Sequence, residues 1–435
     1  MNPACPLRIA AIVALAVLAA ALGSNACAQA PTAQQNAARQ ATRELERAGA
    51  LVMRDLVKNF GLDDERSRAL KERLDETAAA YVAKNPPPVL EWGGPPPIDI
   101  QRVLELPAWR EALQKALDAK ELEAYDAFLA DRKARLEAAA TEYVRALMAA
   151  EFRLSAAQRK AVGGLVERFA KKELETVSPN DWWGGSQICR RFADADQQGD
   201  RVLTAAQVRS GGQARGRNPG IDFSLEAERV KLVCGLDEKA SRLLAAAGAK
   251  AAREQKAVLA KKAADEAKAR AEAKKAKALA KENGGDDLPE DEESPEEETP
   301  KADPPSVLDD PFWRKARDSI VDAEKLKLLA ADVVVDIAAV RAARSALALV
   351  QLEELLHLDK KQVEAVKELV ARQIAAKTTL GAPAALFALD GFGVKEPKSQ
   401  YYDRSVDAKT RAARKALEDL LDRDQLDFLK DRIIL

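Results

Sequence analysis

Apolar residues recur along most of this chain with the spacing of amphipathic helices. Val162, Leu165, Val166 and Phe169 stand at positions i, i+3, i+4 and i+7, which places them on one face of a helix. Almost no stretch alternates apolar and polar residues with the period of a strand, and alanine, leucine, lysine, arginine and glutamate dominate the composition. The pattern therefore predicts an all-α fold.

One helical stretch occurs twice. The sequence from Trp109 to Arg168 returns 204 positions later, from Trp313 to Arg372, without a gap. The unbroken offset indicates that the helix lengths are constrained, as in stacked helical repeats. We interpret Trp109 and Trp313 as packing anchors between helices rather than as ligand-stacking groups.

A leucine followed by a capping residue marks four expected helix starts. The four steps are Leu62-Asp63, Leu154-Ser155, Leu236-Asp237 and Leu358-Asp359. In the second and fourth steps Gln158 or Gln362 stands where a capping box has its reciprocal acceptor, whereas Arg66 and Ala240 take this place in the other two. A second signature, a short helix that runs into a capped one, alternates with the first. The sequence therefore predicts tandem helical repeats of about four units, beginning near residues 45, 150, 230 and 345.

The predicted domains follow these units and the breaks between them. They are a signal peptide over 1–28, a first helical repeat domain over 34–176, an EF-hand-like insert over 177–223, a repeat start with a charged helix over 224–282, a disordered acidic, proline-rich linker over 283–306 and a second repeat domain over 307–435. The linker prediction depends on nine carboxylates between Asp286 and Glu298, because such a charge run cannot form a packed core.

The first residues indicate export. Arg8 precedes an apolar run from Ile9 to Leu22, and small residues follow at Ala26 and Ala28. The run is too short to span a bilayer comfortably, and no later segment is long and apolar enough to do so. We therefore expect a secretory signal that is cleaved after Ala28, and a mature protein without a transmembrane segment in the periplasm or outside the cell.

Side chains typical of catalysis are scarce. His357 is the only histidine, and cleavage of the signal would leave only Cys189 and Cys234 as cysteines. This inventory excludes histidine-based triads and most zinc sites, and we expect His357 to lie at a surface or boundary. The cysteines could pair in an oxidising compartment, with two buried thiols as the alternative. Because catalytic side chains are scarce, we predict that the protein is not an enzyme. The formal net charge of −1 offers no field to attract nucleic acid, so we predict that it binds none.

The insert holds one segment with the spacing of metal ligands. Its candidate oxygen ligands are Asp196, Gln198, Asp200, the carbonyl of Val202, Thr204 and Gln207. In this order they resemble positions 1, 3, 5, 7, 9 and 12 of the EF-hand calcium loop. The resemblance implies weak Ca²⁺ binding, because Arg201 replaces the glycine of the sharp turn and Gln207 replaces the bidentate glutamate.

Two alternatives stay open for this segment. A register that begins at Asp194 restores a glycine at the turn but leaves an alanine at the last ligand position. In the other alternative, Leu203 to Gln207 is a helix start of the repeat, and the carboxylates are only an insertion before it. We expect Asp196 and Asp200 to project from a loop and to contribute nothing to packing.

The helix starts also carry a second resemblance. Leu154 to Gln158, Leu203 to Gln207 and Leu358 to Gln362 are similar to the Leu-Thr-x-x-Gln motif of exported bacterial helical proteins, among them periplasmic stress chaperones. The resemblance implies client binding by a helical cradle and transfers no catalytic residue. We therefore predict an exported, non-enzymatic scaffold or chaperone-like protein with a protein partner. The alternative is a weak calcium-binding EF-hand-domain protein with a calcium-tuned interaction surface.

Overall fold

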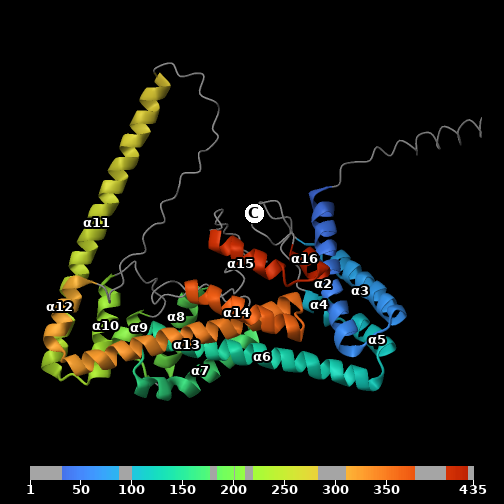
Figure 1. Ribbon diagram of the computed structural model, residues 1–435, viewed down its shortest axis with the longest axis horizontal. Helices are drawn as coiled ribbons and strands as arrows, with labels where there is room; N and C mark the ends of the chain where they lie inside the picture. The colour runs from blue at the N-terminus through green and yellow to red at the C-terminus, as the bar shows by residue number, and fades with distance from the viewer. Residues whose placement is uncertain are drawn as a thin grey trace, which may run out of the picture. The chain divides into compact units, whose positions relative to one another are not determined.

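The structure, a computed structural model, describes residues 32–87, 100–176, 184–199, 201–210, 219–282, 310–377 and 408–429. These residues form fifteen helices and no strand, so the all-α prediction is confirmed (Figure 1). The predicted signal peptide and acidic linker lie outside the described residues. Within the described part of the chain, no helix combines the length and the apolar character that crossing a membrane requires.

The chain divides into two compact units, Met1–Leu122 and Glu123–Leu435. The first unit contains α2 (Ala33–Phe60), α3 (Asp64–Lys84), α4 (Ile100–Leu104), α5 (Pro107–Ala116) and the start of α6 (Ala119–Glu151). Helices α2 and α3 approach closely at Gly49, where an added Cβ would lie 3.0 Å from Leu74 Cδ2. The Trp109 side chain on α5 is buried, as predicted for a packing anchor.

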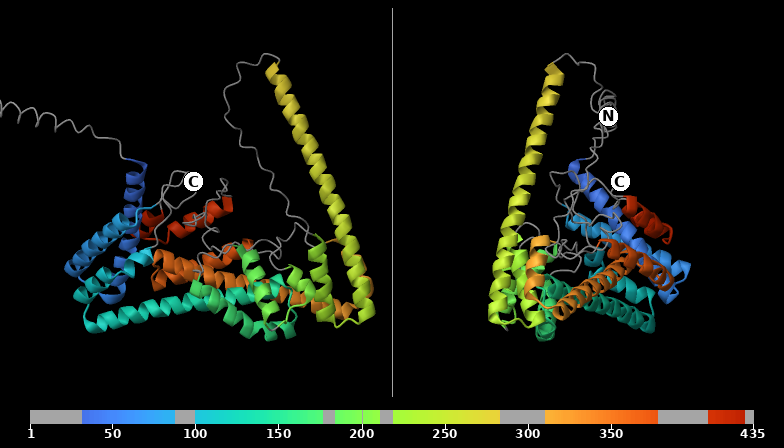
Figure 2. Two further views of the ribbon diagram at one scale, coloured as in Figure 1. Left: turned by 180° about the vertical axis from the view of Figure 1, so that it is seen from behind. Right: turned by 60° about the vertical axis from the view of Figure 1, so that its left-hand side comes forward.

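The second unit contains the remaining helices. They are the rest of α6, α7 (Ala156–Thr176), α8 (Gly184–Gln198), α9 (Ala205–Ser210), α10 (Pro219–Cys234), α11 (Glu238–Glu282), α12 (Pro311–Ile320), α13 (Ala323–Leu356), α14 (Lys360–Lys377), α15 (Ala408–Glu418) and α16 (Arg423–Leu429). One hydrophobic cluster joins α6, α7, α8 and α13 and includes the contacting rings of Phe169 and Phe192. A second cluster joins α10, α11, α12 and α13. In it Phe223 packs on Trp313, which is buried as predicted for the second packing anchor. Figure 2 shows α11 as one continuous helix.

The four predicted helix starts share one kind of turn. The residue before each leucine has a positive φ, with values of 64° at Gly61, 50° at Arg153, 57° at Gly235 and 50° at His357. A left-handed residue ends the preceding helix, and the capping side chain then accepts a hydrogen bond from the first turn of the next one. The predicted caps are therefore present in all four steps.

The cysteines and the histidine are buried. Cys189 and Cys234 lie in different hydrophobic clusters and are not joined by a disulfide, so the structure agrees with the alternative of two buried thiols. His357 ends α13, and its Nδ1 lies 3.5 Å from Arg132 Nη1 on α6. Since the side chain contacts another helix, His357 belongs to the packing of the second unit.

Candidate functional site

Asp196, the first residue of the EF-hand-like segment, lies within α8 and is fully buried. Its Oδ1 accepts a hydrogen bond from the Val202 amide at 2.7 Å, and its Oδ2 accepts one from the Leu203 amide at 3.1 Å. A buried carboxylate with two backbone donors fixes the turn that leads into α9. The expectation that Asp196 projects from a loop and takes no part in packing is therefore wrong.

The other candidate calcium ligands are dispersed among different environments. Gln198 is exposed at the end of α8, and Asp200 lies outside the described residues. The Val202 carbonyl accepts a hydrogen bond from Gln158 Nε2 at 3.2 Å, and Thr204 Oγ1 accepts one from the backbone amide of Gln207 at 3.4 Å. The described residues contain no group of three histidine, cysteine, aspartate or glutamate side chains that could hold a metal. The calcium site stays a prediction.

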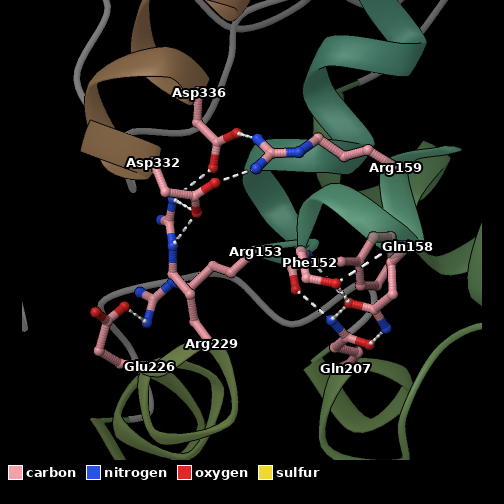
Figure 3. Close-up of polar contacts among 10 residues, drawn as sticks. Phe152, Arg153, Gln158, Arg159, Gln207, Glu226, Arg229, Asp332 and Asp336 are labelled. Atoms are coloured by element: carbon pink, nitrogen blue, oxygen red, sulfur yellow. Dashed lines mark hydrogen bonds and ion pairs between the residues drawn. The ribbon is translucent and has the colours of Figure 1, made fainter. Parts of the chain in front are cut away.

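Gln207, the last candidate ligand, pairs with Gln158 (Figure 3). Gln158 Nε2 donates to Gln207 Oε1 at 2.9 Å, and Gln207 Nε2 donates back to Gln158 Oε1 at 3.2 Å. Gln207 Nε2 also donates to the Phe152 carbonyl at 2.9 Å. Each Oε1 accepts the amide of its own capping residue, Ser155 at 3.1 Å and Thr204 at 2.8 Å. Two capping boxes, at the starts of α7 and α9, are thereby joined through their glutamines.

The same pairing occurs between α14 and α16. Gln362 Nε2 donates to Gln425 Oε1 at 2.8 Å, and Gln425 Nε2 donates to Gln362 Oε1 at 3.1 Å. In the first unit an ion pair between Arg66 and Glu121 joins the corresponding helix starts, and its hydrogen bond lowers the pKa of the Glu121 carboxyl. The sequence predicted two of these capping boxes but not their pairing.

A buried charged cluster lies beside the glutamine pair and joins α7, α10 and α13. Arg229 on α10 donates to Asp332 at 2.6 Å and to Asp336 at 2.8 Å, both on α13. Arg159 on α7 contacts the same two carboxylates from the other side (Figure 3). The side chains of Arg229 and Asp336 are each 1% exposed, so these charges are balanced inside the protein rather than in water.

Burial changes the acidity of this cluster. It raises the pKa of Asp336 to about 6, although Arg229 and Arg159 act in the opposite direction. A second buried ion pair, between Arg153 and Glu226 at 2.7 Å, lies next to it. A raised carboxyl pKa is also a property of general acids. Here the Asp336 carboxylate is engaged by two arginines, and we interpret the cluster as a link between helices.

Helix α13 also carries an exposed apolar surface, which could not be identified from the sequence alone. Leu328, Val334 and Val335 are 59%, 64% and 57% exposed. Exposed alanines fill the positions around them, at Ala331, Ala338, Ala339, Ala342 and Ala346. We call these eight residues the apolar face of α13. The exposed charged residues Lys327 and Arg341 lie beside this face. An apolar stripe on an amphipathic helix usually faces a packing partner.

Helix α6 provides an internal comparison, because it lies 204 positions before α13. Both helices bury equivalent positions, such as Leu136 and Val340. Their exposed positions differ: Val335 and Ala346 of α13 correspond to Asp131 and Glu142 of α6, which are exposed charges. The apolar face is therefore specific to α13. That the two stretches are repeats of one unit stays a prediction.

Comparison with family models, curated proteins and solved structures finds no match to this chain. The features that bear on its function are those of its own residues, namely the buried polar contacts between helices and the apolar face of α13.

Proposed function

We propose that this protein is an exported, non-enzymatic helical-repeat scaffold or chaperone-like protein that acts by binding other proteins. The apolar face of α13 is the observation that carries the proposal. A contiguous exposed apolar patch is a candidate site of interaction with another protein. Covering Leu328, Val334 and Val335, which are all more than half exposed, would contribute on the order of 1 kcal/mol for each side chain.

The buried polar contacts next to this face support the same function. Asp332 and Asp336 attach α13 to α7 and α10 through Arg159 and Arg229. A surface that is held in place before binding loses little conformational freedom when a partner covers it. The charged cluster therefore acts as the support of a binding surface.

Photo-crosslinking in living cells tests the proposal. A photoreactive amino acid at Ala338, within the apolar face, should join the chain covalently to a protein partner. Ala134 is the corresponding exposed position of α6 and provides the matched control, which should yield far fewer adducts. The proposal is wrong if Ala338 yields no adducts, or if both positions yield them equally.

The order of oxygen atoms between Asp196 and Gln207 supports a second candidate, a weak calcium-binding module that tunes the interaction surface. To bind the Asp196 carboxylate, calcium would have to displace the hydrogen bonds that the backbone amides of Val202 and Leu203 donate to it. If calcium binds there, a tenfold excess over its Kd should stabilise the fold by about 1.4 kcal/mol. The Asp196→Asn variant should lose this increment and be less stable without calcium. Melting curves that do not respond to millimolar calcium would exclude this candidate.

A further inference from the structure

We infer that the buried charged cluster between α7, α10 and α13 is a proton-sensitive joint, in which a proton on Asp336 releases Arg159 and loosens the start of α7 from α13. The inference goes beyond the proposed function and does not depend on it, because it concerns how the fold responds to pH. The observations behind it are the arrangement of the four charges, the unequal exposure of the two arginines and the contacts that hold the start of α7.

Four charged side chains from three helices make up the cluster. They are Arg159 on α7, Arg229 on α10, and Asp332 and Asp336 on α13. Each arginine contacts both carboxylates, so two positive charges balance two negative ones (Figure 3). The neighbouring ion pair of Arg153 and Glu226 is balanced in itself. The cluster is therefore neutral only while both of its aspartates are charged.

Asp336 is the member of the cluster that gains a proton as the pH falls. Its side chain is 1% exposed, so its charged form lacks solvation, and the Asp332 carboxylate lies one helical turn away on the same two arginines. Burial and this like charge raise the pKa of Asp336 to about 6, against the effect of Arg229 and Arg159. Asp336 is therefore mostly charged at about pH 7 and mostly neutral at about pH 5.

The two arginines of the cluster differ in their access to water. When Asp336 is neutral, the cluster has one excess positive charge, and an unpaired charge inside a protein is costly. Arg229 is 1% exposed and cannot reach water without a shift of α10, whereas Arg159 is 23% exposed. Turning Arg159 outward removes the excess charge from the interior and leaves Arg229 paired with Asp332. The proton therefore releases the polar link between α7 and α13 and keeps the one between α10 and α13.

The residue next to Arg159 limits this change to one side of α7. Gln158 pairs with Gln207 on α9, and neither glutamine titrates. The start of α7 therefore stays attached to α9 while its polar link to α13 is released. The proton still stabilises the fold as a whole, because it relieves the buried charge of Asp336.

Hydrogen exchange of the full chain at pH 5 and pH 7, measured by mass spectrometry and corrected for the intrinsic effect of pH, tests the inference. The amides of residues 160–166 in α7 should exchange about fivefold faster at pH 5 than at pH 7, with a midpoint near pH 6. Helix α14 is the control within the same chain, because it begins with the same capping box but has Val363 where α7 has Arg159. The amides of residues 364–370 should exchange equally fast at both pH values.

Two variants assign the effect to the charged cluster. Asp336→Asn cannot acquire the charge, so the start of α7 should exchange rapidly at both pH values. Arg159→Gln removes the same contact and leaves the buried aspartate in place, so it should give the same result, and it serves as the test where Asp336→Asn fails to fold.

Three results would each overturn the proton-sensitive joint. The first is equal exchange of α7 at pH 5 and pH 7 in the wild type, and the second is a change of the same size in α7 and α14. The third is a pH dependence of α7 that persists undiminished in Asp336→Asn or in Arg159→Gln.

Discussion

Replacing Gln207 by methionine tests the polar contacts that join the helices of the second unit. Methionine has a similar length, so the main change is the loss of the amide group. The Gln207 side chain is 1% exposed and makes four hydrogen bonds, two with Gln158 and one each with Thr204 and Phe152. Each buried group that loses its partner costs about 1–3 kcal/mol. We therefore expect Gln207→Met to lower the free energy of unfolding by about 3 kcal/mol.

Urea unfolding followed by far-UV circular dichroism measures the effect. Gln40→Met is the matched control, because Gln40 is exposed on α2 and should change stability by less than about 0.5 kcal/mol. Adding Gln158→Met to Gln207→Met should cost much less than the sum of the two single changes, because both act on one contact. A loss below about 1 kcal/mol for Gln207→Met, or additive losses in the double variant, would refute the reasoning.

Three further predictions concern packing, pH and the turns. Trp313→Ala should lower the free energy of unfolding by about 3–5 kcal/mol, and a near-neutral result in urea unfolding would contradict its role as an anchor. Because burial raises the pKa of Asp336 from 3.8 to about 6, the folded state binds this proton more tightly than the unfolded state, so the stabilisation is complete below about pH 4 and lost as pH rises through 6. The stability of the wild type relative to Asp336→Asn should therefore fall by about 2 kcal/mol between pH 4 and pH 7, and a constant difference would argue against it. Gly61→Ala should cost about 1 kcal/mol at its positive φ, whereas Gly163→Ala, within α7 with no atom near its Cβ, should be neutral or stabilising. Equal losses at both glycines would contradict this account of the turn.

Local features of the fold could be predicted from the sequence. The spacing of apolar residues predicted helices, and Ser155 with Gln158 predicted a capping box, because caps are formed by neighbouring residues. The burial of Trp109 and Trp313 could be predicted because both recur at equivalent places in a helical pattern. The caps depend on residues only a few positions apart in the chain.

Contacts between distant segments could not be predicted in the same way. The spacing of Asp196 to Gln207 is that of an EF-hand and predicts that the Asp196 carboxylate projects from a loop. In the folded chain α8 continues past it, and the carboxylate turns inward to the backbone. Arg229 and Asp336 stand 107 positions apart, so nothing local indicated their contact. Asp332 and Asp336, two acidic residues within a mostly apolar stretch of α13, were the sequence signal that could have indicated a buried charged contact.

The apolar face of α13 was overlooked for a different reason. An apolar run in a helical sequence predicts burial, and a sequence does not show which side of a helix the rest of the fold leaves uncovered. Only the exposed fractions of Leu328, Val334 and Val335 separate this face from the buried row that contains Val340.

Cysteine accessibility in living cells tests most directly the claim that a protein covers this face. Val334→Cys lies on the apolar face, and Ala130→Cys occupies the corresponding exposed position of α6. The account predicts that a membrane-permeant maleimide modifies Val334→Cys much more slowly in cells than in dilute purified protein, while Ala130→Cys reacts at the same rate in both. Equal rates in cells and in dilute solution for Val334→Cys would contradict the claim.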